Sequence, residues 1–428
     1  MAASLDMDEV RGSFPALAGE QVYLDNAGGS QALGAVAERI RDYLLNTNVQ
    51  LGATYSTGKK STDRYNEGYA AAAKYIGASR DEIVLGPSTT QLFRNVSYAL
   101  RFQEGDELIV SVVDHEANIA PWVDLAERQK LVLKWWKPNS DTPDAKTNPK
   151  LLASDLADLL TDKTRLVTCT HASNILGTIH DIKAITSTVH SHNPNALVCV
   201  DAVAYAPHRK IDVKDLGVDF YSFSWYKVYG PHISLLYASP LALSQLHSLG
   251  HFFNPHTTLE HKLGLAAASY ELVHALPAVV SYLNNGDDDD DNNDGGGKWP
   301  AIVAHETTLQ TTLLNWLDSR GADDVVVYGE RSADARARVP TVSFGVRGWG
   351  ARELVEAVEA DADAEEGAVF GFRWGAFYSV RLVEDVLGLS SSSSGDGVVR
   401  VSMVHYNTVD EVKGLIAVLE KVLAAGRK

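Results

Sequence analysis

Lys227 is the residue with the clearest capacity for covalent chemistry. It lies between aromatic residues in the stretch F-Y-S-F-S-W-Y-K-V-Y-G-P-H, at positions 220–232. An amine in an apolar, tightly turned setting loses its charge more readily than one in water, and the neutral amine can form a Schiff base with a carbonyl compound. This stretch alone favours a simpler alternative, in which the alkyl stem covers apolar surface and the ammonium group stays in water.

Other polar side chains follow short apolar runs of the chain, at the points where buried strands would end. Nearly continuous apolar strands that alternate with helices predict a mostly parallel sheet covered by helices on both faces. In such sheets a ligand binds beyond the carboxyl ends of the strands, so we expect these side chains to surround one ligand. They are Ser88, Thr89, Thr90, His115, Asn174, Asp201, Ser224 and Lys227.

This set of side chains matches the groups of pyridoxal phosphate. Thr89 and Thr90 would start a helix, where free backbone N–H groups favour a phosphate, with a simple helix cap as an equal alternative. The carboxylate of Asp201 would pair with the pyridine nitrogen and make the ring a better electron sink. His115 would stack on the ring, unless it is an ordinary hydrogen-bonding loop residue. Ser224 would reach the phosphate from the lysine side.

Two further segments supply candidate substrate contacts. Arg400 is flanked by apolar residues in V-V-R-V-S-M-V, where a guanidinium group needs a carboxylate partner. The α-carboxylate of a substrate is a good bidentate match, and an internal salt bridge is the alternative. Near the start of the chain, Y-L-D-N-A-G-G-S is either a simple turn or a place where backbone approaches a ligand closely. We assign substrate contacts to Arg400, Asn26 and Gly28.

Composition sets the broad class of the protein. The chain has 428 residues, a formal net charge of -17, and apolar and charged shares of 45% and 22%, which are ordinary for a globular protein. The negative charge argues against nucleic acid and anionic membrane as partners. Cys169 and Cys199 both lie in apolar runs, so we expect buried thiols and no disulfide framework. No signal peptide or membrane span is predicted, a cytoplasmic location is expected, and no metal site is proposed.

The predicted organisation has two lobes. Residues 1–30 are expected to form an N-terminal segment that packs with the small domain, residues 31–262 the large domain, and residues 263–428 a smaller α+β domain. Residues 284–298 are rich in Asp, Asn and Gly and cannot bury a core, so a disordered insert is expected there.

The order of motifs resembles that of a known family. N-A-G-G, S-T-T, D-H-E-A-N-I-A-P-W, T-H-A-S-N-I-L-G-T, V-D-A-V, Y-S-F-S-W-Y-K-V-Y-G-P-H and R-V-S-M-V-H-Y-N-T are similar to the cysteine-desulfurase-like branch of class V aminotransferases, across residues 8–424. These are fold-type I PLP-dependent enzymes, and the resemblance implies an α/β fold and a homodimer. It also implies roles for the site residues, with Lys227 as Schiff-base lysine, Asp201 at the pyridine nitrogen, His115 on the ring, Thr89, Thr90 and Ser224 at the phosphate, Asn174 beside the ring hydroxyl and substrate, and Arg400 at the substrate carboxylate.

The chain also departs from the family pattern. Desulfurases carry a persulfide-forming cysteine on a loop before the last strand, and the chain has Tyr378 near that place. Without a thiolate nucleophile, the usual sulfur transfer should fail. Ala204 replaces the family's glutamine after the pyridine aspartate, and Tyr226 replaces the histidine before the lysine. Residues 264–272, G-L-A-A-A-S-Y-E-L, lack the threonine that usually contacts the partner's phosphate.

A PLP site without this cysteine can still carry out chemistry at Cα and Cβ of an amino acid. The Asp- and Ser-rich inserts suggest a fungal chain, and fungal members of this branch include the decarboxylative aldolase of ustiloxin biosynthesis, a secondary-metabolism enzyme that the chain resembles. We therefore expect decarboxylative aldol addition of L-aspartate to an aldehyde, with Arg373 or Arg347 as candidate for the second carboxylate. A C–S β-lyase ranks nearly equal, and a transaminase, an epimerase or a catalytically silent binding protein are further alternatives.

Overall fold

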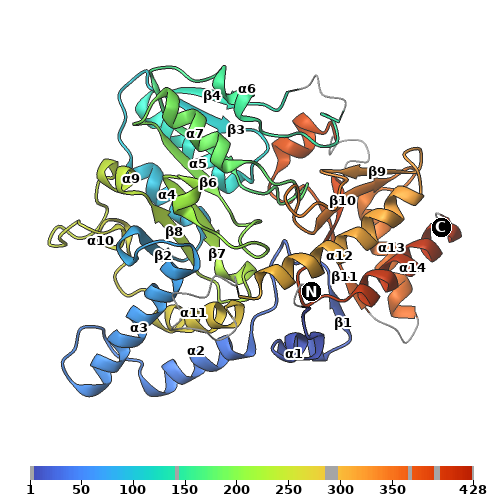
Figure 1. The fold of residues 1–428 in the computed structure, drawn as a ribbon, viewed down its shortest axis with the longest axis horizontal. Coiled ribbons are helices and arrows are strands. Elements are labelled where there is room, and N and C mark those ends of the chain that lie inside the picture. The colour runs from blue at the N-terminus through green and yellow to red at the C-terminus, as the bar shows by residue number, and fades with distance from the viewer. Residues whose placement is uncertain (1–3, 140–143, 285–296, 365–368, 390–395, 427–428) are drawn as a thin grey trace.

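The computed structural model describes residues 4–139, 144–284, 297–364, 369–389 and 396–426. Figure 1 shows a larger lobe that contains β2 to β8 and a smaller lobe that contains β9, β10, α13 and α14. The main helices are α1 (Met7–Gly12), α2 (Gly34–Asn46), α3 (Ser56–Tyr75), α4 (Thr89–Ala99), α5 (Ala120–Gln129), α6 (Ala153–Ala157), α7 (Ile182–His192), α8 (Val213–Leu216), α9 (Pro240–Gln245), α10 (Leu259–Leu263), α11 (Tyr270–Leu283), α12 (Trp299–Ser319), α13 (Ala351–Ala364) and α14 (Val409–Ala425).

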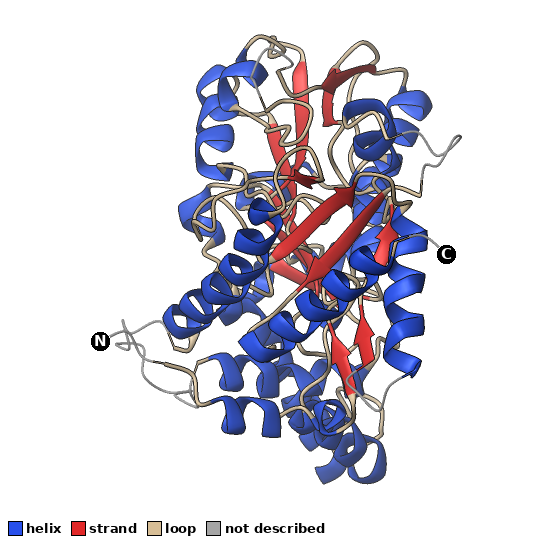
Figure 2. Cartoon of the chain, turned by 90° about the vertical axis from the view of Figure 1, so that its right-hand side faces the viewer, coloured by secondary structure: helices blue, strands red, loops and turns tan. Residues whose placement is uncertain are grey.

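The larger lobe is built on a sheet that has seven strands within the described residues. Their spatial order is β2-β8-β7-β6-β5-β3-β4. Neighbouring strands are parallel, except that β8 runs antiparallel to both β2 and β7. The strands are β2 (Ile83–Gly86), β3 (Glu107–Ser111), β4 (Val132–Trp136), β5 (Thr164–Thr170), β6 (Leu197–Asp201), β7 (Phe220–Ser224) and β8 (Ser234–Ala238). Residues of β6, β7 and β8 are buried throughout because helices cover both faces of the sheet (Figure 2), as the continuous apolar runs predict.

The smaller lobe contains an antiparallel sheet with the order β12-β13-β10-β9. Its strands are β9 (Val325–Tyr328), β10 (Thr341–Val346), β12 (Arg373–Gly375) and β13 (Val398–Ser402). The N-terminal segment lies against this lobe, because β1 (Gln21–Tyr23) pairs with β11 (Val369–Gly371) and Asp25 bridges to Ser402. These pairings bring residues near the start of the chain beside Arg400 in β13.

Residues 264–269 separate α10 from α11, and α11 packs on α2 and α3 of the larger lobe. A Cβ atom at Gly264 would lie 2.5 Å from the carbonyl oxygen of Glu260, and Ala267 has a positive φ of 55°, so this segment turns instead of continuing the helix. The boundary at residue 262 stays a prediction, and most of the predicted insert at 284–298 lies outside the described residues.

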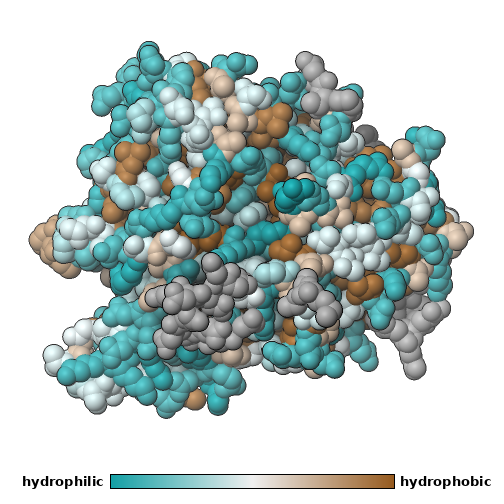
Figure 3. Space-filling view, viewed as in Figure 1, coloured by the Kyte–Doolittle hydropathy of each residue, from teal (hydrophilic) through white to brown (hydrophobic). Residues whose placement is uncertain are grey.

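The surface is consistent with a strongly charged chain. On the face in Figure 3, hydrophobic residues are scattered among hydrophilic ones. None of the described helices has both the length and the apolar character needed to cross a membrane.

Candidate active site

Lys227 ends a short 3-10 helix, Trp225–Lys227, that follows β7 directly. Its side chain is buried, with 8% of its surface exposed. Burial and, to a smaller extent, the positive charge of Arg400 lower the pKa of the Lys227 amine from 10.5 to about 8, while Asp201 and Asp25 oppose the shift. The amine therefore loses its proton more readily than an exposed lysine, as the aromatic sequence around it predicts.

The residues predicted to hold a cofactor meet in one cavity of about 90 Å³ at the carboxyl edge of the main sheet. Its walls come from the segments that follow β2, β3, β5, β6 and β7, which all end at this edge. The lining residues are Ser88, Thr89, Thr90, His115, Ala117, Thr170, Ala172, Asn174, Asp201, Val203, Ala204, Ser224, Tyr226 and Lys227.

Asp201 presents a buried carboxylate to this cavity from the last position of β6. Its Oδ1 accepts a hydrogen bond of 2.9 Å from the Val203 N–H, and the described residues provide no hydrogen-bond donor to its Oδ2. Burial raises the pKa of Asp201 to about 6, although the Val203 hydrogen bond and Lys227 oppose the shift. A buried carboxylate of this kind needs a further donor or cation, which a protonated pyridine nitrogen would supply.

A cluster of hydroxyl groups lies at the start of α4. Thr89 Oγ1 is 3.0 Å from Ser224 Oγ, which is 2.7 Å from Ser234 Oγ. The Ser88 side chain caps only the Gln91 N–H, so the other N–H groups at the start of this 11-residue helix receive no bond from it. Hydroxyl donors beside free backbone N–H groups are suited to a phosphate.

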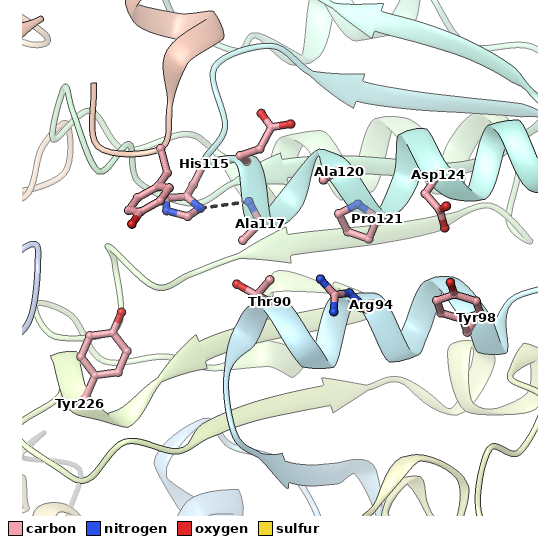
Figure 4. Close-up of a pocket in the computed structure, with 11 residues that line it drawn as sticks. Thr90, Arg94, Tyr98, His115, Ala117, Ala120, Pro121, Asp124 and Tyr226 are labelled. Carbon is pink, nitrogen blue, oxygen red and sulfur yellow. Dashed lines mark hydrogen bonds between the residues drawn. The ribbon is translucent and has the colours of Figure 1, made fainter. Parts of the chain in front are cut away.

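His115 forms part of the cavity wall after β3. Its Nδ1 accepts a hydrogen bond of 3.0 Å from the Ala117 N–H, so the proton of the neutral ring is on Nε2 (Figure 4). Burial, followed by the positive charges of Lys227 and Arg400, lowers the pKa of His115 to about 4. The ring is therefore neutral near pH 7.

These features fit pyridoxal phosphate. Each polar group of this cofactor finds a partner in the cavity. Lys227, with its depressed pKa, suits the aldehyde, the Oδ2 of buried Asp201 suits the pyridine nitrogen, and the hydroxyl groups of Thr89 and Ser224 suit the phosphate. Thr90 is an exposed residue that also lines the cavity. The individual roles of these residues stay predictions.

The guanidinium group of Arg400 already has partners within the chain. Its Nη2 lies 2.7 Å from Asp25 Oδ1 and its Nη1 donates to the Asn174 carbonyl oxygen at 3.1 Å. Its guanidinium carbon stacks 3.6 Å from the Phe377 ring centroid, and its buried Nε has no hydrogen-bond partner among the described residues. The internal salt bridge that the sequence left as an alternative is thus present, while the Nε donor has no hydrogen-bond partner among the described residues.

Asp25 also links Arg400 to Arg373. Arg373 Nε is 2.6 Å from Asp25 Oδ2, and Arg373 stands opposite Arg400 in the register of β12 and β13. A Cβ atom at Gly28 would lie 2.8 Å from Asp25 Oδ2, so glycine permits this tight turn. Asp25 was not among the predicted site residues, although it directly precedes the N-A-G-G turn.

The other predicted substrate contacts have internal partners. Asn174 Nδ2 donates to the Phe377 carbonyl oxygen at 3.0 Å, and its Oδ1 accepts from Ser379 Oγ at 2.9 Å. Asn26 is buried, donates to Tyr23 and Ser402 carbonyl oxygens at 2.9 Å, and accepts from the Tyr406 hydroxyl. A substrate contact with Asn26 would require these bonds to break.

Arg347 lies away from the cavity, beside Asp323, Asp324 and Trp349 in a separate surface pocket. Arg373, in contrast, contributes to the electrostatic environment of Lys227. Of the two arginines considered for a second carboxylate, only Arg373 is therefore near the site.

A second, larger pocket of about 620 Å³ adjoins the lysine cavity and shares Thr90, His115, Ala117 and Tyr226 with it. Figure 4 shows it between α4 and the segment that leads into α5. This pocket was not predicted from the sequence, because no motif marks a space between two helices. Its lining residues are Thr90, Arg94, Tyr98, His115, Glu116, Ala117, Ala120, Pro121, Asp124, Tyr226 and Tyr378.

Neither thiol can take the place of the missing loop cysteine. Cys169 and Cys199 are both fully buried in strands, and burial raises the pKa of each thiol. At the loop position, Tyr378 is 75% exposed and its ring centroid is 5.3 Å from that of His115. Sulfur transfer through a persulfide on this chain is therefore not supported.

Comparison with known proteins identifies the family. The sequence model of the family described as Aminotransferase class-V matches residues 22–415. The chain belongs to the class-V aminotransferase family. Class-V aminotransferases and cysteine desulfurases are PLP-dependent enzymes, so membership implies this cofactor and confirms the predicted enzyme class.

This class-V aminotransferase has fungal relatives of nearly equal length. It is 54% identical to the Aminotransferase-like protein FGM3 of Gibberella zeae, over 99% of this chain and 100% of the relative. It is 37% identical to the Cysteine desulfurase-like protein ustD of Aspergillus flavus, over 98% of this chain and 91% of the relative. These similarities confirm the predicted cysteine-desulfurase-like branch.

Solved structures confirm the fold of this class-V aminotransferase. The apo cysteine desulfurase from Thermococcus onnurineus superposes with a TM-score of 0.82 at 23% identity, covering 99% of this chain and 100% of the other. The cysteine desulfurase CsdA from Escherichia coli gives a TM-score of 0.80 at 24% identity, with the same shares covered. Together they support the α/β fold-type I architecture, with a mostly parallel sheet and a smaller C-terminal lobe.

Proposed function

We propose that this enzyme catalyses decarboxylative aldol addition of L-aspartate to an aldehyde. The bond from Cβ to the β-carboxylate breaks and releases carbon dioxide, and Cβ forms a new bond to the aldehyde carbon. The aldehyde oxygen takes up a proton, so the products are carbon dioxide and a γ-hydroxy amino acid.

The observation that supports two reactants is the pair of joined pockets. The small cavity beside Lys227 is lined by the residues proposed to hold the cofactor, and the adjoining pocket of about 620 Å³ offers space for a second reactant beside an amino acid held there. A reaction on one small amino acid alone would not need this space. Holding two reactants next to each other also lowers the entropic barrier to bond formation.

When bound, pyridoxal phosphate supplies an electron sink for the negative charge that develops as bonds at Cα and Cβ break. Lys227 would provide the amine that holds the cofactor, and its lowered pKa of about 8 allows it to accept and return a proton near neutral pH. Asp201 would keep a proton on the pyridine nitrogen. The neutral His115 would cover the ring and exclude water from it.

Binding of the substrate carboxylates is proposed to involve the two arginines that share Asp25. The α-carboxylate would bind the unpaired Nε of Arg400, or replace Asp25 at its Nη2. Arg373, which is 55% exposed at its side chain, is the candidate for the second carboxylate. We also propose that the enzyme acts as a homodimer in the cytoplasm, as the family resemblance implies.

C–S β-elimination from cysteine is the second candidate function. It is favoured by the structural similarity to proteins named cysteine desulfurases, whereas the burial of Cys169 and Cys199 limits it to a route without a persulfide on this chain. Transamination and epimerisation would need only chemistry at Cα and would leave the larger pocket without a role.

The test is a mass-spectrometric assay of PLP-loaded protein with L-aspartate and an aromatic aldehyde, and separately with L-cysteine. Loss of carbon dioxide together with an aldehyde adduct would support the proposal, and a Lys227→Ala variant should give neither. Sulfide and pyruvate from cysteine, without an adduct from aspartate, would instead establish a C–S lyase. An amino acid converted to its keto acid or its epimer would identify one of the Cα reactions, and a silent binding protein would convert none.

A further inference from the structure

One face of α4 forms a regular wall of the larger pocket. Thr90, Arg94 and Tyr98 are spaced by four residues, so their side chains follow one another along the helix (Figure 4). Each step of four residues advances by roughly 6 Å. The opposite wall presents Ala120, Pro121 and Asp124 from α5. We call the space between these walls the α4–α5 groove.

The groove leads away from the lysine cavity. Thr90, Ala117 and Tyr226 line both spaces, so a molecule whose reactive group lies near Lys227 extends along the groove. Such a molecule meets the threonine hydroxyl first, the Arg94 guanidinium one step further, and the Tyr98 ring after that.

The charged side chains along this path differ in their pairing. Asp124 forms an ion pair of 2.6 Å with Arg128, and Glu116 lies 3.8 Å from Arg381. Arg94, in contrast, has no carboxylate or aromatic partner for its side chain in the part of the chain that the structure describes. The α4–α5 groove thus offers an unpaired cation between acidic groups that are already neutralised.

The rest of the lining is suited to a flat, apolar body. Tyr226 and Tyr378 stand near the lysine end, and Ala117 and Pro121 provide small apolar surface. The Tyr98 ring at the outer end is 52% exposed and carries Arg128 on its face at 4.2 Å. Aromatic and apolar walls around one cation are typical of a site for an aromatic anion.

We propose that the α4–α5 groove binds the aldehyde reactant, and that Arg94 recognises an anionic group, a carboxylate or a phosphate, on that reactant. The inference rests on the proposed two-reactant function and adds to it the chemical class of the second substrate. A para-disubstituted benzene ring matches one step of the α4 wall, which places its anionic group beside Arg94 when its aldehyde lies near Thr90.

Binding is tested first, because it does not depend on turnover. Isothermal titration of PLP-loaded protein with 4-methylbenzoate and with phenyl phosphate should give weaker binding in Arg94→Gln than in the wild type, by roughly tenfold for the preferred anion. Arg101→Gln is the matched control, since it removes the same charge from an exposed position just after α4, outside the groove. Equal affinity in both variants, or no binding of either probe to the wild type, would overturn the inference.

Turnover provides the second test and separates the two proposals. With L-aspartate, the ratio of kcat/KM for 4-formylbenzoate to kcat/KM for its neutral methyl ester should fall about tenfold in Arg94→Gln, stay unchanged in Arg101→Gln, and partly recover in Arg94→Lys. Adduct formation with an unchanged ratio would reject the role of Arg94 and leave the proposed function standing. No adduct with any aldehyde would reject the proposed function, while the titration still decides whether the groove binds anions.

Discussion

Replacing Asp25 with asparagine should destabilise the enzyme because it removes the charge partner of a buried arginine. Asp25 pairs with Arg400 at 2.7 Å and with Arg373 at 2.6 Å. The two distances are nearly equal, but the Arg400 side chain is 1% exposed and the Arg373 side chain 55% exposed. Burial therefore separates the two contacts: Asp25→Asn removes both, whereas Arg373→Gln removes only the exposed one.

The size of the effect follows from this difference. Removing one member of a buried pair costs about 3–5 kcal/mol, whereas an exposed pair contributes about 0–1 kcal/mol. Because 28% of the Asp25 side chain is itself exposed, we expect the lower end, about 3 kcal/mol, for Asp25→Asn. For 428 residues the unfolding entropy is roughly 0.9 kcal/mol/K, so this loss lowers Tm by about 3 °C.

Differential scanning calorimetry of the PLP-loaded variants measures this shift. Arg373→Gln is the matched control and should lower Tm by less than about 1 °C, since it breaks only the exposed contact. A double variant with Asp25→Asn and Arg400→Met should recover part of the loss, because it also removes the unbalanced charge. Equal shifts in the two single variants, or no recovery in the double variant, would refute the reasoning.

Three further predictions concern the site. Since the pKa of Lys227 is lowered to about 8, its neutral fraction rises with pH, and the rate of Schiff-base formation between apoprotein and pyridoxal phosphate should increase roughly tenfold from pH 7 to 9 and then level off, followed by absorbance. A rate that kept rising beyond pH 9 would mean an unperturbed lysine. Asp201→Asn should reduce kcat by about two orders of magnitude while the cofactor remains bound, as measured by turnover and by the cofactor spectrum; near-normal turnover would exclude its role at the pyridine nitrogen. Replacing both Cys169 and Cys199 with alanine should leave turnover of aspartate and aldehyde within about twofold, because both thiols are buried away from solvent; abolished turnover in a folded variant would contradict this.

Much of the larger lobe was predictable because its local patterns agree with its tertiary environment. The polar residues expected at strand ends lie at or just after the ends of β2, β3, β5, β6 and β7, since buried parallel strands are continuous apolar runs. The strand β4 was missed, because V-L-K-W-W contains a lysine and lies at the sheet edge, where burial is incomplete. The antiparallel direction of β8 was also not predicted, as strand direction depends on pairing partners far apart in sequence.

The candidate site also contains features that the sequence predicts and features that it does not. The polar residues at strand ends were found because parallel strands bring their carboxyl ends to one edge, whatever the details of packing. The pairing of Arg400 with Asp25 was not determined in advance, since these residues are 375 positions apart and meet only through the bridge between Asp25 and Ser402. The α4–α5 groove likewise depends on how two helices pack.

The sequence by itself indicated the family, through the order of its motifs, and Lys227 as the candidate Schiff-base lysine, because these depend on residue types along the chain. Only the tertiary structure decided which charges are balanced and which are free. Arg400 is held by Asp25, which its apolar flanks could not identify as the partner, while Arg94 has no partner among the described residues. Ion pairing depends on distance and burial in space, and both arise only when remote segments of the chain pack together.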